Sequence, residues 1–100
     1  MDNRDYLVIL YDYYGELLND RQREYFELYY FDNLSLGEIS ENLNVSRNAV
    51  HKTIKLVEDK LLFYEDKLKI YYKSNKIMKI ANDINNKNIK NSIVNILREE

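Results

Sequence analysis

Residues 35–57, SLGEISENLNVSRNAVHKTIKLV, constrain the fold more than any other part of the chain. Ser35 and Glu38 form a capping box, in which each side chain accepts a hydrogen bond from the other residue's backbone N–H at the start of a helix. Asn44 suits the end of that helix, because asparagine tolerates the left-handed conformation such an end needs. Ser46 then caps a second helix. The segment therefore predicts two helices joined by a tight turn.

This helix-turn-helix arrangement can place its second helix in the major groove of DNA. Val50, Ile54 and Val57 recur at spacings of four and three, so they face inward and leave the polar residues outside. Cations on that outer side can neutralise phosphates, while Arg47 and Asn48 are residue types that hydrogen-bond base edges. The predicted nucleic-acid-binding residues are Ser46, Arg47, Asn48, His51, Lys52 and Lys55.

The distribution of charge leaves two interpretations of this outer face open. Residues 1–45 carry three arginines against ten acidic residues, whereas residues 46–100 carry twelve basic residues against seven acidic ones. This asymmetry hints at a basic binding face. The whole chain, however, has a net charge of -2, and DNA-binding domains are typically basic overall. A solvated helix face or a protein-docking module is thus the alternative to nucleic-acid contact.

The rest of the hydrophobic pattern predicts an all-α protein. The chain has no proline and two glycines, which favours helix. Apolar residues at spacings of three and four predict a helix over residues 6–18. Gly15 within it indicates a close contact or an early helix end. Asn19, with Gln22 as its capping-box partner, begins the next helix.

A heptad-like stripe runs from the second helix of the motif toward the C-terminus. Its members are Val50, Ile54, Val57, Leu61, Tyr64, Leu68 and Tyr71. The stripe predicts one long helix to about residue 72, which is either a dimeric coiled coil or a face packed on the protein's own N-terminal helix. We expect internal packing for residues 50–61, because Leu62 and Phe63 widen the stripe. We expect Tyr64, Leu68 and Tyr71 to form a self-association surface, with a homodimer as the resulting assembly.

The expected domain organisation follows from this stripe. Residues 1–72 form the helix-turn-helix domain, including the long fourth helix. Residues 73–100 form a helical tail, in which two amphipathic stretches flank the NNKN segment at 85–88. The tail either folds back on that domain or docks on a partner.

Chemistry-bearing motifs are missing from the sequence. His51 is the sole histidine and there is no cysteine, so we predict no metal site and no disulfide. There is no P-loop, dinucleotide-binding or nucleophile-elbow motif, so we predict no enzyme activity and no cofactor. No apolar run approaches the roughly 18 residues of a membrane-spanning helix, so we expect no membrane insertion.

The chain also resembles a known family over residues 6–68. The matching stretches are LNDRQREYFELYYFDNLSLGEI at 18–39, VSRNAV at 45–50 and YEDKL at 64–68. They resemble the YlxM-like proteins, small bacterial helix-turn-helix proteins tied to the signal recognition particle pathway. The RQRE and VSR elements are also similar to region 4 of bacterial sigma factors.

The resemblance implies an all-α, cytoplasmic, non-enzymatic protein with a sigma-region-4-like helix-turn-helix and a long C-terminal helix extension. It suggests two functions. One is a nucleic-acid-binding regulatory protein of the signal recognition particle pathway, acting on DNA or RNA. The other is an interaction protein that docks on the particle's GTPase or its RNA without binding DNA. Lys52 stands where relatives commonly have an acidic residue, which makes the outer face more basic here.

Overall fold

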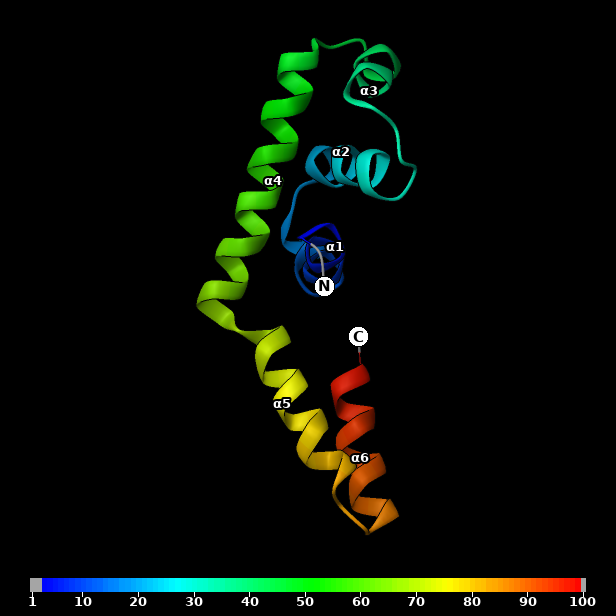
Figure 1. Ribbon diagram of the computed structural model, residues 1–100, viewed down its shortest axis with the longest axis vertical. Coiled ribbons are helices and arrows are strands. Elements are labelled where there is room, and N and C mark those ends of the chain that lie inside the picture. The colour runs from blue at the N-terminus through cyan, green and yellow to red at the C-terminus, as the bar shows by residue number, and fades with distance from the viewer. Residues whose placement is uncertain (1–2, 100) are drawn as a thin grey trace. The chain divides into compact units, whose positions relative to one another are not determined.

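The computed structural model describes residues 3–99, and these residues form helices joined by short turns (Figure 1). The elements are α1 (Asn3–Tyr14), a 3-10 turn η1 (Gly15–Leu17), α2 (Asp20–Tyr30), α3 (Leu36–Leu43), α4 (Arg47–Leu68), α5 (Ile70–Asn82) and α6 (Lys87–Arg98). The predicted all-α class is confirmed. No helix within residues 3–99 has both the length and the apolar composition needed to cross a bilayer.

The chain divides into two compact units, Met1–Lys67 and Leu68–Glu100. The first, which we call the helix-turn-helix unit, contains α1, η1, α2, α3 and nearly all of α4. The second, which we call the hairpin unit, contains α5 and α6. This division falls beside the end of α4 and separates the helix-turn-helix from the two C-terminal helices.

The core of the helix-turn-helix unit gathers apolar residues from all four of its helices. Each of the following is buried: Leu7, Leu10, Tyr14, Leu18, Tyr25, Phe26, Tyr30, Ile39, Val50, Ile54, Val57 and Leu61. The stripe of α4 through Leu61 thus belongs to the protein's own core, as expected. Burying each of these side chains contributes about 1.5–3 kcal/mol relative to exposure, so α4 is held firmly against the helices that precede it.

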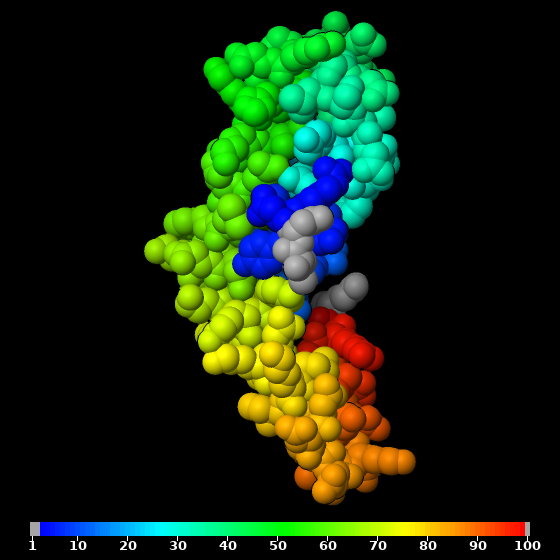
Figure 2. Space-filling view, in the orientation of Figure 1, coloured from blue at the N-terminus to red at the C-terminus, as the bar shows by residue number. Residues whose placement is uncertain are grey.

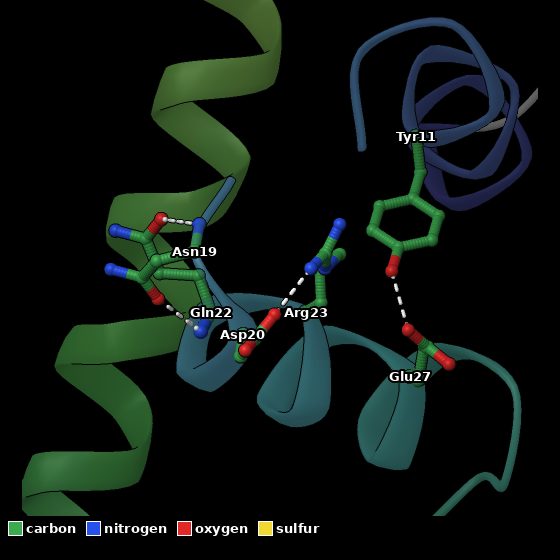
Figure 3. A network of polar contacts seen from close by, with 6 residues as sticks. All are labelled: Tyr11, Asn19, Asp20, Gln22, Arg23 and Glu27. Carbon is green, nitrogen blue, oxygen red and sulfur yellow. Dashed lines mark hydrogen bonds and ion pairs between the residues drawn. The ribbon is translucent and has the colours of Figure 1, made fainter. Parts of the chain in front are cut away.

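Aromatic stacking joins α1 to α2. The Phe26 ring stacks with the rings of Tyr11 and Tyr30, each with its centroid 4.3 Å away. The Tyr11 hydroxyl donates a 2.5 Å hydrogen bond to Glu27 on the surface of α2 (Figure 3). Arg4 of α1 covers the end of α2, where its guanidinium donates to the Tyr29 carbonyl at 2.8 Å. These contacts fix α1 on α2, the helix that precedes the motif.

Both predicted capping boxes are present. Asn19 accepts from the Gln22 backbone N–H, and the Gln22 side chain accepts from the Asn19 N–H (Figure 3). Ser35 and Glu38 form the same reciprocal pair at α3. Gly15 fulfils both expectations for it. The α-helix ends at Tyr14, and a Cβ on Gly15 would stand 3.1 Å from the Tyr11 ring.

The prediction of one helix continuing to about residue 72 is wrong. The α4 helix ends at Leu68, Lys69 has a φ of 55°, and α5 begins at Ile70. A left-handed lysine costs roughly 1–2 kcal/mol. The break comes where burial along α4 ends, since Leu61 and Glu65 are buried whereas Leu68 is 46% exposed. Beyond the break, α5 packs on α6.

The hairpin unit contains two helices, as predicted for the tail, but α5 begins at Ile70, before the predicted tail, and α6 begins at Lys87, inside the NNKN segment. A short connection follows α5, and Asn86 caps α6 by accepting from the backbone N–H groups of Asn88 and Ile89. The two helices lie side by side and antiparallel (Figure 1). Ala81 is the one fully buried residue among the described positions of this unit. The hairpin therefore has almost no core of its own.

Candidate nucleic-acid interface

Two hydrogen bonds between Ser40 and Val45 fix the turn between α3 and α4. Asn44 has φ 54° and ψ 48°, the left-handed conformation predicted for it. The Val45 backbone N–H donates to the Ser40 carbonyl at 3.1 Å, and the Ser40 hydroxyl donates to the Val45 carbonyl at 2.6 Å. These bonds therefore fix how the chain passes from α3 to α4.

Ser46 begins α4. Its Oγ accepts a 3.1 Å hydrogen bond from the Ala49 backbone N–H, and its carbonyl accepts from Val50. The side chain therefore caps the helix, as the sequence predicts. The hydroxyl is exposed and keeps its proton for a further acceptor such as a phosphate oxygen.

The remaining predicted site residues are also exposed on α4. These are Arg47, Asn48, His51, Lys52 and Lys55. At about 100° per residue, Asn48 and Lys52 lie opposite the buried row of Val50, Ile54 and Val57. The face that points away from the core thus carries the side chains proposed to meet a ligand. Figure 2 shows α3 (teal) and the first turns of α4 (green) next to one another at one end of the helix-turn-helix unit.

Arg47 extends toward α3 rather than directly outward. Its terminal nitrogen Nη2 lies 2.7 Å from the point where a Cβ on Gly37 would stand, and its Cζ lies 3.0 Å from that point. A side chain at residue 37 would occupy the space of the guanidinium. The glycine in α3 therefore decides where the Arg47 side chain can lie.

His51 and Lys55 line a small hollow between three helices. The hollow, about 110 Å³ in volume, is lined by Tyr29, Leu36, His51, Ile54, Lys55 and Glu58. Glu58 accepts a hydrogen bond from the Tyr30 hydroxyl. The Lys55 ammonium forms a 3.2 Å ion pair with Asp59 on the next turn, between two exposed side chains. Such exposed pairs are worth little, so Lys55 can exchange Asp59 for another anion.

The start of α4 is a local exception to the acidity of its unit. Residues 46–57 contain Arg47, Lys52 and Lys55 and no acidic residue, and Glu58 and Asp59 mark the end of this run. Among residues 3–99, Arg47 and Lys52 form no ion pair in the structure. Their charge is available to an external anion. Glu38 of α3 follows Gly37 in the sequence and carries the charge opposite to that of Arg47. Hydrogen bonds from Ser35 hold the pKa of the Glu38 carboxyl below its usual range.

The three residues predicted for self-association do not share one helix. Tyr64 is half-buried, with its ring centroid 5.9 Å from that of Tyr14. Leu68 is exposed at the end of α4, and Tyr71 lies beyond the break, in α5. They do not continue the regular helical row from which this surface was predicted.

Sequence reasoning assigned no role to Gly37, although the structure places it beneath Arg47. Its place inside the capping box was the signal in the sequence, because a glycine there lowers helix propensity although no turn requires it. The described residues contain no group of three or more histidine, cysteine, aspartate or glutamate side chains placed to hold a metal ion.

A short α3, a left-handed turn and an α4 with a basic, exposed start define a helix-turn-helix protein. The chain belongs to the family described as "Putative helix-turn-helix protein, YlxM / p13 like", whose model matches residues 1–99.

Several relatives share this family. A UPF0122 protein of Caldanaerobacter subterraneus subsp. tengcongensis is 51% identical over 74 residues, which cover 74% of this chain and 63% of the relative. One from Oceanobacillus iheyensis is 45% identical over 80 residues, covering 80% of this chain and 76% of the relative. One from Bacillus thuringiensis is 53% identical over 64 residues, covering 64% of this chain and 58% of the relative. The chain thus spans less than two thirds of the first of these relatives.

Proposed function

We propose that the first turns of α4 bind duplex nucleic acid, with α4 lying in the major groove. The observation that carries this proposal is the acid-free run of residues 46–57, whose outer face is exposed, directly after a fixed turn. A second helix that leaves a tight turn with its outer face bare is the geometry by which helix-turn-helix proteins read DNA. Affinity would come chiefly from cations that displace counterions from phosphates.

The residues divide into two roles under this proposal. Arg47 and Asn48 stand nearest the start of α4, where recognition helices contact base edges. Arginine suits guanine O6 and N7, and asparagine suits adenine N6 and N7. Lys52 and Lys55 follow along the same helix and serve the phosphate backbone, with His51 and the Ser46 hydroxyl as further hydrogen-bond donors.

We infer that the protein regulates the signal recognition particle pathway through this contact. The family resemblance supports that context, and the basic Lys52 supports the nucleic-acid contact. A direct experiment is selection of bound sequences from a pool of random duplexes. The wild type should enrich a short motif, and Asn48→Ala should lose the preference at one position of that motif. Recovery of an unenriched pool by the wild type would contradict base recognition.

A second candidate function rests on the acidic surface of α2. Residues 1–67 carry eight basic and fourteen acidic side chains, and a shallow groove on α2 is lined by Asp20, Arg23, Glu24, Glu27, Leu28 and Asp32. Such a surface repels nucleic acid and suits a basic protein partner. In this alternative the helix-turn-helix is a scaffold that docks on the particle's GTPase, or on its RNA through another face. Binding to the purified GTPase that persists in a variant with alanine at residues 47, 52 and 55 would favour it.

A further inference from the structure

The hairpin unit exposes a row of isoleucines. Ile70 is 41%, Ile77 42% and Ile80 65% exposed on α5, while Ile89 is 53% and Ile96 65% exposed on α6. Together they present on the order of 500 Å² of apolar surface, which is at the upper end of the 300–600 Å² patch that a typical monomer leaves bare. These five residues are called the isoleucine face below.

The isoleucine face lies on one side of the hairpin. The half-buried or buried residues Tyr71, Ser74, Met78 and Ala81 mark the row of α5 that meets α6, and Lys90, Ile93, Val94 and Leu97 mark the matching row of α6. At about 100° per residue, four of the exposed isoleucines stand roughly 60–110° from that row and Ile80 stands roughly 140° from it, all in the same rotational sense. In an antiparallel pair, equal displacements in the same sense point to the same side. All five isoleucines therefore form one surface.

A hairpin of this size needs support beyond itself. The hairpin unit spans residues 68–100, and domains shorter than roughly 40 residues usually need disulfides, a metal or oligomerisation to be stable. The sequence contains no cysteine, and no metal-holding group of side chains occurs in the described part of the chain. Of these three sources of stability, oligomerisation is the one that remains. Two copies of a two-helix hairpin joined through apolar faces give a four-helix arrangement, with a core that one hairpin lacks.

The placement of charge favours a second copy over a charged partner. On the same helical geometry, Lys73 lies within the isoleucine face, between the directions of Ile77 and Ile80, whereas Lys79, Lys87 and Arg98 point to the opposite side of the hairpin. An anionic membrane facing the isoleucines would therefore leave most of the positive charge directed away from it. A second hairpin meets the face with isoleucine against isoleucine and keeps Lys79, Lys87 and Arg98 on the outside, while the long side chain of Lys73 extends its ammonium past the contact into solvent.

We propose that this protein forms a homodimer in which the isoleucine faces of two hairpin units pack against each other. The contact has two-fold symmetry, as is usual for dimers of identical chains. The exposed isoleucine surface of each copy is about two thirds of the roughly 800 Å² that a partner buries in a standard interface, and flanking side chains supply the remainder. This assembly does not depend on the proposed nucleic-acid binding.

Sedimentation of the full-length protein over a range of concentrations tests the proposal. The wild type should be a dimer at micromolar concentration. The variant Ile80→Asp with Ile96→Asp should be a monomer, with the dimer dissociation constant raised at least about 100-fold by the loss of apolar burial. The matched control is Asn82→Asp with Asn91→Asp, which adds the same charge to the same helices on the opposite side. It should remain a dimer.

A second variant addresses the integrity of the hairpin. Ile80→Ala with Ile96→Ala removes apolar surface but favours helix, because alanine has the highest helix propensity. It should weaken the dimer while circular dichroism shows unchanged helix content. A wild type that is monomeric at the highest soluble concentration would overturn the proposal, as would a dimer that survives both isoleucine variants. A monomeric wild type that co-sediments with phosphatidylglycerol vesicles would also overturn it and would assign the face to a membrane.

Discussion

The guanidinium of Arg47 occupies the space that a side chain on Gly37 would fill, with Nη2 2.7 Å from the position of that missing Cβ. The two residues belong to different helices of the motif and are ten positions apart in the chain. Because the contact involves the flexible end of Arg47, a larger residue at position 37 would displace the guanidinium rather than break the fold. Gly37 therefore couples the surface of α3 to the proposed reading face of α4.

Gly37→Ala is expected to separate stability from binding. Alanine within a helix is favoured over glycine by roughly 0.5–1 kcal/mol, so the melting temperature should stay the same or rise. Affinity for the selected duplex should fall about tenfold, since a displaced arginine loses a contact worth about 1–3 kcal/mol. Fluorescence anisotropy measures the second effect and thermal denaturation the first.

The control for this pair is a double-mutant cycle. In the background of Arg47→Ala, the Gly37→Ala change should no longer affect binding, because the side chain it displaces is gone. An equal loss of affinity in both backgrounds would show that residue 37 acts independently of Arg47.

Asn44 provides a test of the turn. Its left-handed backbone suits glycine and opposes a β-branched residue. Asn44→Val should lower the free energy of unfolding by about 1–3 kcal/mol, and Asn44→Gly should change it much less. Urea denaturation compares the two variants. Equal midpoints would mean that the left-handed conformation does not control the stability of the motif.

The hydrogen bond between Tyr14 and Glu65 ties α1 to the last turn of α4. Both residues are buried, and the hydroxyl donates to Oε1 at 2.5 Å. Tyr14→Phe removes the hydrogen bond that the buried Glu65 carboxyl group accepts, and it should destabilise the protein by about 1–3 kcal/mol. Adding Glu65→Met should recover part of the loss, because the polar group then disappears with its donor. No change in unfolding free energy for Tyr14→Phe would contradict this assignment.

Whether a feature of this fold can be predicted from the sequence depends on how far apart in the chain its interacting residues lie. The capping pairs at Asn19 and Ser35 and the turn at Asn44 depend on residues a few positions apart, so the sequence displays them directly. The break at Lys69 has no such signal, because its neighbours favour helix and the end of α4 depends on where burial along the helix stops. The contact of Arg47 with Gly37 needs the crossing of α3 and α4, which periodicity does not specify.

Alkaline pH should expose the role of two tyrosines. Burial, followed by the hydrogen bond to Glu27, raises the pKa of Tyr11, and burial with the hydrogen bond to Glu58 raises the pKa of Tyr30. A raised pKa in the folded state contributes stability that is complete below the unfolded value of about 10 and is lost as pH rises above it. The melting temperature should therefore fall above about pH 10, and Tyr11→Phe with Tyr30→Phe should flatten this decline. An identical decline in that variant would place the sensitivity elsewhere.

The salt dependence of duplex DNA binding tests the central claim most directly. Affinity of the wild type should fall linearly with salt on a log–log plot, and Lys52→Ala should reduce the slope by about one, because one fewer phosphate is neutralised. Alanine at residues 47, 52 and 55 together should reduce both the slope and the affinity further, with the melting temperature unchanged. Unaltered DNA affinity in the triple variant would contradict binding through α4.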